Sequence, residues 1–341
     1  MNRTQIKKAK MPVFSEEELL VGNRFLVLNK IGRGSFGEIF EGVDREKNSK
    51  VAIKMESRSG KTSQLSHEYY VYRKLEGTEG IPKIFWYGNE GGYNILVIEL
   101  LGRNLEQMFD KCRRRFTLKT LLMLADKMVF KCNGQLRRLE YIHKKDYVHR
   151  DIKPENFLIG PSSTGSRNLF IIDFGLAKRF RDKDTREHIL YIDGKSLVGT
   201  ARYASINSHM GIELSRRDDL EQLAHVLLYL NRGSLPWQGQ KGRTKSEKFG
   251  KILEMKKSIS ITNLCKGVPD VFGKLLHYAR GLRFDENPDY RYLRRMFMDV
   301  FCRHGFTSDG RFDWISEKAP SLHPQQLEID AQEDETEDTE M

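Results

Sequence analysis

Short runs of branched and aromatic residues, broken by Gly and Asn, fill the first hundred positions of the chain. This texture is typical of β-strands joined by tight turns. One stretch with helical spacing, residues 63–75, interrupts the runs. The runs themselves lie at 24–32, 38–44, 50–56, 83–89 and 93–101. The pattern therefore predicts a β-rich region that contains one main helix.

After Gly102 the pattern changes to longer segments with apolar residues three and four positions apart. Such spacing places the apolar side chains on one face of an α-helix. The segments lie at 118–131, 136–144, 216–230, 268–281 and 288–302. At 341 residues the chain also exceeds what one small hydrophobic core usually organises. We therefore expect an α+β protein of two lobes, the first rich in strands and the second mostly helical.

The two ends of the chain lack this periodicity. Residues 1–20 read as a lead-in with basic residues but without the apolar stretch of a secretory signal. Residues 317–341 form an acidic tail without Phe, Trp or Tyr, and this composition predicts disorder. No run of about 18 apolar residues occurs, so we expect no membrane segment. The four cysteines, Cys112, Cys132, Cys265 and Cys302, form no CxxC spacing, which argues against a zinc site or a disulfide framework. An intracellular protein of the cytoplasm or nucleus is expected.

The charge is distributed unevenly along the chain. There are 58 Lys and Arg against 47 Asp and Glu, and eight of the acids lie within residues 328–341. The remainder therefore carries 58 basic against 39 acidic residues, a net charge of +19. Such a basic body is either a solvated surface or a surface for anionic ligands. Nucleic acid is one such ligand, although no zinc finger, RNP-type strand or bZIP heptad pattern is present.

Three glycines, Gly32, Gly34 and Gly37, fall within GRGSFGEI between two predicted strands. Glycines allow a backbone to turn tightly over phosphate groups and to present its N–H groups to them, although such a hairpin alone is a weak signal. Lys54 ends VAIK in the next predicted strand. A lysine there can pair with nucleotide phosphates while a carboxylate holds it. Glu68, on the one predicted helix of this region, is the candidate partner.

The strongest signal is HRDIKPENF at 149–157. Asp151 would accept or orient the proton of an attacking hydroxyl, and Lys153 would offset negative charge on the transferred phosphoryl group. Asn156 would bind a metal ion. IIDFG then places Asp173 directly after an apolar strand, as a second Mg²⁺ ligand. Four motifs in this order predict ATP-dependent phosphoryl transfer.

On these motifs the chain resembles a eukaryotic protein kinase over roughly residues 18–316, and it is similar specifically to the casein kinase 1 family. The stretches that carry the similarity are LLVGNRF, ELLGRNLEQMF, LLMLADKM, EYIHKKDYVHRDIKPENFLIG, GTARYASINSHMGIELSRRDDLE and GSLPWQG. Within them, Ser205-Ile206-Asn207 stands where most kinases have Ala-Pro-Glu, and this replacement is a mark of the casein kinase 1 family.

The resemblance implies a bilobal kinase domain over 21–316, with an N-lobe at about 21–99 and a C-lobe at about 102–316. ATP and Mg²⁺ would bind between the lobes, and the γ-phosphoryl group would pass to a Ser or Thr hydroxyl, since Lys153 is typical of Ser/Thr kinases. The resemblance places the nucleotide against Ile31, Gly32, Gly34, Gly37, Ile39, Ala52, Lys54, Glu68, Ile98, Glu99, Leu101 and Leu158.

The resemblance also implies a substrate preference, for Ser or Thr three residues after an acidic or phosphorylated residue. It places the receiving anion site at Arg202, Gly239 and Lys248, with Lys195 nearby. A second basic cluster, Arg150 and Lys178, lies where many kinases hold the phosphate of their own activation loop. Arginine and lysine suit such a site because their hydrogen bonds to phosphate are charge-assisted. The expected partners are acidic or primed proteins, without a membrane or a specific nucleic acid, and the enzyme is expected to be a monomer.

The neutral side chain of Asn207 is explained by the absence of the basic residue that pairs with this position in most kinases. In most kinases the Glu at this place pairs with an Arg in a late segment of the C-lobe. The corresponding stretch here is DENPD at 285–289, with Asp289 near the place of the Arg. Acid and base are thus absent together, which avoids an unpaired buried charge.

The chain departs from the family pattern at VFKCNGQ, residues 129–135. Asn133 and Gly134 are poor helix residues, so we expect a bulge or break near 131–135. Two alternative functions stay open, a pseudokinase scaffold and a basic nucleic-acid-binding protein. The candidate catalytic and metal-binding residues argue against the first, and the ordered series of motifs argues against the second.

Overall fold

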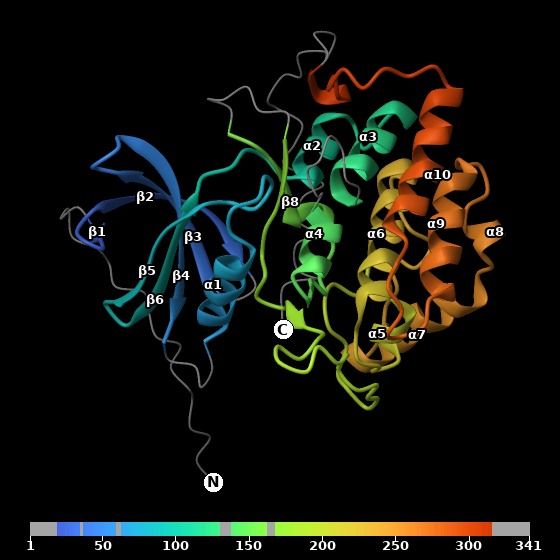
Figure 1. Cartoon of the computed structure of the whole chain (residues 1–341), viewed down its shortest axis with the longest axis horizontal. Coiled ribbons are helices and arrows are strands. Elements are labelled where there is room, and N and C mark those ends of the chain that lie inside the picture. Colours follow the sequence, from blue (N-terminus) through green and yellow to red (C-terminus); the bar gives the residue numbers. More distant parts are fainter. Residues whose placement is uncertain (1–18, 35–36, 59–62, 130–137, 162–167, 316–341) are drawn as a thin grey trace.

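The computed structural model describes residues 19–34, 37–58, 63–129, 138–161 and 168–315. A twisted sheet with one helix forms the N-terminal part, and a larger helical part follows it along the chain (Figure 1). The expected α+β architecture is therefore confirmed. The predictions for residues 1–18, 131–135 and 317–341 lie outside the described residues.

The sheet of the N-terminal part is antiparallel throughout, in the order β1-β2-β3-β4-β6-β5. Its long strands correspond to the five predicted runs, which confirms that prediction. The strands are β1 (Leu20–Val21), β2 (Phe25–Gly34), β3 (Gly37–Asp44), β4 (Ser49–Ser57), β5 (Ile84–Glu90) and β6 (Tyr93–Glu99).

Alternation along β4 separates the two faces of this sheet. Val51, Ile53 and Met55 pack with β6 residues in a small apolar cluster on one face. Because successive side chains of a strand point to opposite faces, Lys54 points to the other face. That face is the one that α1 (Gln64–Leu75) covers (Figure 1). Strand register thus decides that the lysine meets the helix.

Helix α1 begins at a well-formed N-cap. The Ser63 side chain accepts a hydrogen bond from the backbone N–H of Ser66 at 3.0 Å, which satisfies one free donor of the first turn. Leu65, Val71 and Leu75 are buried at helical spacing, and Glu68 is buried among them. An acid on the buried face of a helix needs a partner, because burial of an unpaired charge is unfavourable. The helix therefore presents Glu68 to the site described below.

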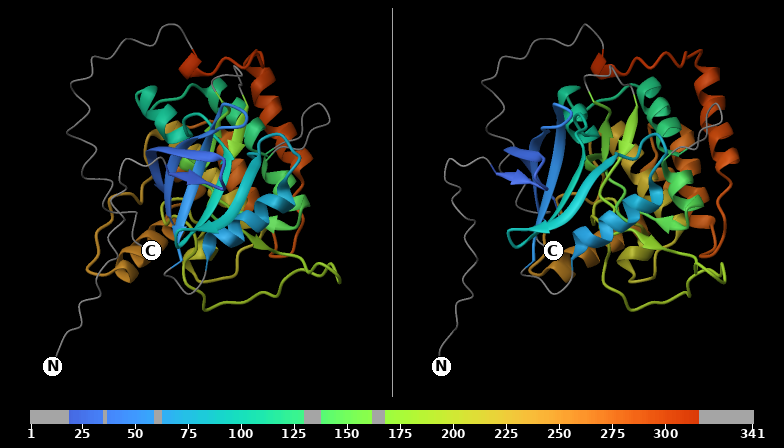
Figure 2. Two further views of the ribbon diagram at one scale, coloured as in Figure 1. Left: turned by 90° about the vertical axis from the view of Figure 1, so that its left-hand side faces the viewer. Right: turned by 60° about the vertical axis from the view of Figure 1, so that its left-hand side comes forward.

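The second part of the chain is mainly helical, and it lies beside the sheet (Figure 2). The helices are α2 (Leu105–Lys111), α3 (Leu118–Val129), α4 (Arg138–Lys144), α5 (Ile206–His209), α6 (Arg216–Arg232), α7 (Lys245–Ser258), α8 (Ile261–Leu264), α9 (Asp270–Gly281) and α10 (Tyr290–Arg303). The short strands are β7 (Tyr147–Val148), β8 (Phe157–Ile159), β9 (Leu169–Ile171) and β10 (Lys178–Arg179).

Each of the five predicted helical segments contains an observed helix, so these predictions are confirmed apart from their ends. Helix α9 begins two residues later than predicted because Pro269 is its N-cap. Helix α10 also begins later, because the Asp289 side chain caps it by accepting from the N–H of Tyr292 at 2.8 Å. The sequence analysis did not predict α7, whose buried residues are Ile252 and Lys256, with Phe249 and Met255 partly buried beside them.

Helix α6 is the centre of the helical part. Every residue from Asp218 to Leu230 is buried, and the helix packs against α9. At its first turn the Asp218 carboxylate accepts from the N–H of Ser215 at 2.8 Å, and at its end Gly233 has a left-handed φ of 88°. Within the described residues, no helix is both long and apolar enough to cross a lipid bilayer.

Asn207 lies beside a buried acid that the sequence analysis did not consider. The Asn207 amide donates to Oδ1 of the buried Asp218 at 2.9 Å, and Ser205 donates to the same oxygen at 2.8 Å. Burial raises the pKa of Asp218 to about 6, and these hydrogen bonds oppose the rise. A Glu in place of Asn207 would therefore face a carboxylate. The interpretation of Asn207 from the sequence is incomplete, because an acid from α6 determines what this position can hold.

Candidate active site

Three charged residues from distant parts of the chain meet beside the sheet. Lys54 Nζ lies 2.6 Å from Glu68 Oε2 and 3.4 Å from Asp173 Oδ1. The Lys54 side chain is 9% exposed and the Glu68 side chain 3%, so the pair is shielded from water. The Tyr72 hydroxyl of α1 also accepts a hydrogen bond from the N–H of Asp173 at 3.2 Å. The helix, the sheet and the segment after β9 are thus joined at one point.

Burial and charge act against each other in this cluster. Burial alone would lower the pKa of Lys54, but the carboxylates of Asp173 and Glu68 raise it above its ordinary value. Burial raises the pKa of Glu68 to about 7, and Lys54 opposes that rise. Although burial would also raise the pKa of Asp173, Lys54 and Lys153 hold it below its ordinary value. Asp173 is therefore ionised at neutral pH.

Asp151 and Lys153 lie in the loop between β7 and β8. Lys153 Nζ is 2.7 Å from Asp151 Oδ2. The other carboxylate oxygen, Oδ1, accepts from both the N–H and the hydroxyl of Thr200, each at 2.9 Å. Burial would lower the pKa of Lys153, but Asp151 raises it above its ordinary value. The carboxylate is thus held in one orientation by a cation and a threonine.

Asp219 of α6 holds this loop in place. Its carboxylate accepts from the N–H groups of His149 and Arg150, both at 2.8 Å, and lies 2.8 Å from His143 Nε2. Arg150 has a φ of 72°, a conformation that is unfavourable for a residue with a side chain. The two bonds from consecutive N–H groups to one buried carboxylate stabilise that conformation. The sequence analysis did not identify Asp219, although its place in SRRDDLE was visible.

Asn156 lies five residues after Asp151 and directly precedes β8. Its side-chain amide donates to the carbonyl of Asp151 at 2.9 Å, and its own backbone carbonyl accepts from the N–H of Ile172 at 3.0 Å, next to Asp173. The amide nitrogen is therefore engaged, which leaves the amide oxygen for a ligand. An amide oxygen and an ionised carboxylate are ligands that suit Mg²⁺, which usually completes its shell with phosphate oxygens and water. The residues present fit a magnesium ion.

The glycine-rich hairpin of β2 and β3 passes close to Lys54. A Cβ atom at Gly34 would lie 3.4 Å from Lys54 Cε, so the hairpin backbone runs beside the lysine side chain. A Cβ atom at Gly37 would lie 2.2 Å from the carbonyl oxygen of Met55, which no side chain can tolerate. Gly37 is thus required by the close approach of β3 to β4. Gly32 pairs with Ile39 across the hairpin.

The remaining residues predicted to contact nucleotide lie along the same edge. Ala52 and Ile98 are opposite each other in β4 and β6, and Val51 pairs with Glu99. Leu158 forms a bridge with Asn104, and the N–H of Gly102, next to Leu101, donates to the carbonyl of Ile159 at 2.9 Å. Ile31, in β2, is 49% exposed. Apart from Ile31, these positions lie in β4, in β6, in β8 and in the segment after β6 that pairs with β8.

A family model for the protein kinase domain matches residues 25–291. The chain belongs to the protein kinase family. Lys54, Glu68, Asp151, Asn156 and Asp173 all lie inside the matched range of this kinase. The order of a strand-rich and a helical part, and the convergence of these side chains, agree with that assignment.

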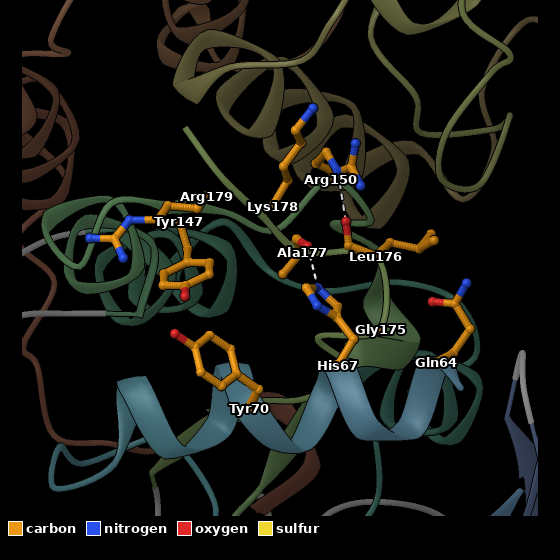
Figure 3. A pocket seen from close by; sticks show the side chains of 10 residues that line it. All are labelled: Gln64, His67, Tyr70, Tyr147, Arg150, Gly175, Leu176, Ala177, Lys178 and Arg179. Carbon is orange, nitrogen blue, oxygen red and sulfur yellow. Dashed lines mark hydrogen bonds between the residues drawn. The ribbon is translucent and has the colours of Figure 1, made fainter. Parts of the chain in front are cut away.

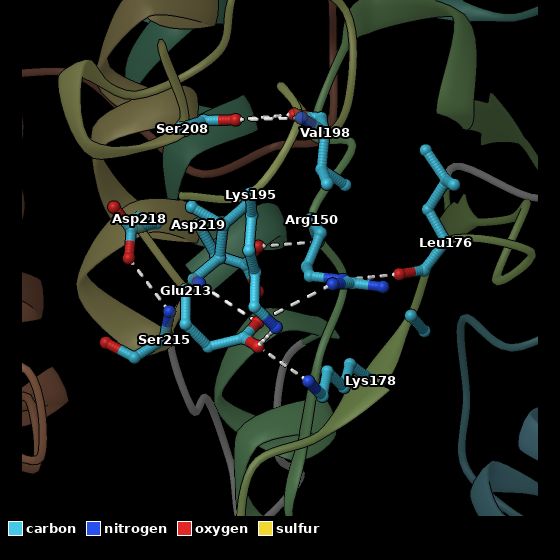
Figure 4. A network of polar contacts seen from close by, with 12 residues as sticks. Arg150, Leu176, Lys178, Lys195, Val198, Ser208, Glu213, Ser215, Asp218 and Asp219 are labelled. Atoms are coloured by element: carbon cyan, nitrogen blue, oxygen red, sulfur yellow. Dashed lines mark hydrogen bonds and ion pairs between the residues drawn. The ribbon is translucent and has the colours of Figure 1, made fainter. Parts of the chain in front are cut away.

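The second basic cluster, predicted as Arg150 and Lys178, surrounds an acid that the sequence analysis did not consider. Lys195, which was predicted near Arg202, contacts the same acid. Glu213 is buried, and its Oε2 lies 2.6 Å from Lys178 Nζ and in contact with Lys195 Nζ. Arg150 Nη1 is 3.7 Å from Oε1 of the same carboxylate. Figure 4 shows the three cations pointing toward Glu213 from three separate segments. Their charge is thus partly neutralised within the protein, with three cations to one acid.

The other predicted anion-binding residues are Arg202, Gly239 and Lys248. A hydrogen bond from Trp237 links the segments that carry the first two. Arg202 stacks over the rings of Tyr203 and Tyr229, each with its guanidinium carbon 5.8 Å from the ring centroid. Its carbonyl accepts from Trp237 Nε1 at 2.7 Å, two residues before Gly239. Gly239 is exposed with a φ of 70°, and Lys248 follows in α7.

A pocket of about 400 Å³ lies between α1 and the segment that follows Asp173 (Figure 3). The charged side chains that line it, Arg150, Lys178 and Arg179, are all basic. Within it, His67 Nε2 contacts the carbonyl of Ala177 at 2.7 Å and Arg150 Nε donates to the carbonyl of Leu176 at 2.6 Å. The full set of lining residues is Gln64, His67, Tyr70, Tyr147, Arg150, Gly175, Leu176, Ala177, Lys178 and Arg179. The pocket thus lies between α1 and the second basic cluster.

Thr200→Val tests the orientation of Asp151. The substitution removes the hydroxyl that donates to Asp151 Oδ1 but keeps the backbone N–H bond to the same oxygen. Because a hydrogen bond to a charged group contributes about 1.5–3 kcal/mol, we expect kcat to fall about tenfold with little change in the KM for ATP. Steady-state kinetics would measure both. Thr307→Val, at an exposed position after α10, is the control, and a kcat within twofold of the wild type for both variants would contradict this role.

Proposed function

We propose that this kinase is a Ser/Thr kinase of the casein kinase 1 type, which transfers the γ-phosphoryl group of ATP to acidic or previously phosphorylated proteins. The observation that carries the proposal is the convergence of Lys54, Glu68 and Asp173 in one cluster, with Asp151 paired to Lys153. Phosphoryl transfer needs mainly positioning and charge neutralisation, and this arrangement supplies both.

In this proposal Lys54 binds the nucleotide phosphates and Glu68 holds the lysine. Asn156 and Asp173 would hold Mg²⁺, which would neutralise charge on the phosphate oxygens. The hairpin with Gly32, Gly34 and Gly37 covers the phosphates with its backbone. Ala52 and Ile98 contact the adenine, together with the other residues predicted at that edge, Ile31, Ile39, Glu99, Leu101 and Leu158.

Asp151 accepts or orients the proton of the attacking hydroxyl. Its orientation is supported by the two bonds from Thr200, and Lys153 lies close enough to offset charge on the transferred group. Lys153 also supports the Ser/Thr assignment.

The substrate preference is proposed to arise at Arg202, Gly239 and Lys248. Arg202 lies in the segment that follows Thr200, and Gly239 lies two residues after Trp237, which donates to the carbonyl of Arg202. Lys248 lies in α7, the helix whose Lys256 donates to the carbonyl of Ala201. An acid or phosphate three residues before the acceptor would be recognised by the positive charge of Arg202 and Lys248. Arg150, Lys178 and Lys195 add positive charge, but Glu213 already occupies the centre of that cluster.

A peptide comparison tests the proposed preference. Three peptides would differ at a single position, which lies three residues before the acceptor serine. That position would hold phosphoserine, aspartate or alanine. We expect kcat/KM to fall in that order, and the advantage of phosphoserine over alanine to shrink about tenfold in the Lys248→Ala variant. Lys257→Ala, at an exposed position of the same helix, is the matched control. Equal kcat/KM for the three peptides would contradict the acidic preference, and no transfer to any of them would favour the pseudokinase alternative.

A further inference from the structure

Four consecutive backbone carbonyls of the segment after Thr200 are bound by buried side chains. Lys256 Nζ donates to the carbonyls of Ala201 and Ala204, at 2.9 and 2.6 Å. Between them, Trp237 Nε1 donates to the carbonyl of Arg202 at 2.7 Å. The fourth carbonyl, that of Tyr203, lies 2.9 Å from His225 Nδ1. Side chains from α6, α7 and the chain between them thus bind every carbonyl from 201 to 204.

The local conformation explains why these carbonyls need outside donors. The N–H groups of Tyr203 and Ala204 both donate to the carbonyl of Thr200, at 3.0 and 2.9 Å, which makes residues 200–204 a single turn. A single helical turn leaves its last carbonyls without partners inside the turn. Buried carbonyls without partners are unfavourable, so a donor must come from elsewhere.

Lys256 is an unusual donor because it is fully buried. Its side chain lies in α7 at 1% exposure, with Nζ 5.0 Å from the Trp237 ring centroid. Lysine is rarely buried to this extent unless it is paired. The charged groups around it are Glu221 of α6 and Arg280 of α9, with His209 Nε2 at 3.2 Å. Burial lowers the pKa of Lys256 to about 7, and Glu221 opposes that change. Either protonation state of the amine has two hydrogens for the two carbonyls.

The turn is attached to the candidate catalytic residue at its other end. Thr200, its first residue, donates twice to Asp151, and Arg202, within the turn, is a candidate for substrate recognition. We propose that Lys256, assisted by Trp237 and His225, is a positioning residue that sets the place of the protein substrate relative to Asp151. This inference rests on the proposed protein phosphorylation, but it does not depend on the preference for acidic substrates.

Lys256→Met tests the proposal, because Met keeps the apolar stem of the side chain and removes the donor. The matched control is Lys257→Met, since the neighbouring lysine of α7 is exposed. We expect the KM for a protein substrate to rise about tenfold in Lys256→Met, with the KM for ATP within twofold of the wild type. Trp237→Phe, which keeps an aromatic ring and removes the Nε1–H, should show a smaller change in the same direction.

Hydrogen exchange supplies a readout that does not need a substrate. Amides of residues 200–205 should exchange about tenfold faster in Lys256→Met than in Lys257→Met, while those of α9 should be unchanged. Unaltered exchange in this segment, or an equal rise in KM for both lysine variants, would overturn the proposal. If the wild-type protein phosphorylates no protein at all, the proposed function fails, and the exchange experiment still decides whether Lys256 positions the turn.

Discussion

Replacement of Asp151 by Asn is expected to lower kcat for protein phosphorylation by about 10²- to 10⁴-fold. The amide keeps the shape of the side chain and can still accept from Thr200, but it cannot take a proton and loses its attraction for Lys153. The affinity for ATP should change little, because Asp151 lies outside the cluster of Lys54, Glu68 and Asp173. Radiolabel transfer from ATP to casein, with nucleotide affinity measured separately, would show both effects.

The control for this experiment is Asp299→Asn, which makes the same chemical change at an exposed position on α10. Its kcat should equal that of the wild type. A kcat for Asp151→Asn within threefold of the wild type would show that this carboxylate takes no part in the proton transfer. It would not by itself contradict membership of the kinase family, which rests on the domain match.

Replacement of Glu213 by Gln is expected to lower the free energy of unfolding by about 2 kcal/mol. Breaking a fully buried ion pair costs about 3–5 kcal/mol, but the Lys178 and Lys195 side chains are 36% and 34% exposed and can regain water. Because the Gln amide has nearly the same shape as the Glu carboxylate and would still fit the site, the loss of stability measures the contribution of the negative charge. Thermal and urea unfolding would measure it, with Glu247→Gln as the control, since Glu247 pairs with an exposed lysine one turn away on α7.

The difference in stability between wild type and Glu213→Gln should depend on pH. Burial would raise the pKa of Glu213, but the hydrogen bonds from Lys178 and Lys195 hold it below its ordinary value of 4.5. A group with a depressed pKa in the folded state contributes stability that is complete above its unfolded pKa and is lost as the pH falls through its folded pKa. The wild type should therefore lose its advantage over Glu213→Gln as the pH falls below about 4.5. A stability difference that is constant from about pH 7 to about pH 3 would contradict this account of the cluster.

The predicted elements and the observed ones agree where the apolar spacing is regular. The five strands of the sheet and the five long helical segments were visible as alternating or helical spacing. Helix α7 was not predicted, since one of its two fully buried positions is Lys256, which carries no hydrophobic signal, and its Phe249 and Met255 are only partly buried. The helix starts after Pro269 and Asp289 were misplaced by two residues, because capping rather than apolar spacing sets them.

The candidate catalytic and metal-binding residues could be proposed without any coordinates, since Lys54, Asp151, Asn156 and Asp173 belong to motifs whose spacing is local. Glu68 was also predicted as the partner of Lys54, and the 2.6 Å contact confirms that pairing. The partners of Glu213 and Lys256, in contrast, could be assigned only after the chain was folded. Glu213 lies among three cations from separate segments, and Lys256 reaches carbonyls more than fifty residues earlier in the chain. The physical reason is that a buried charge takes the partner that folding brings to it, and periodicity along the chain carries no information about contacts over such separations.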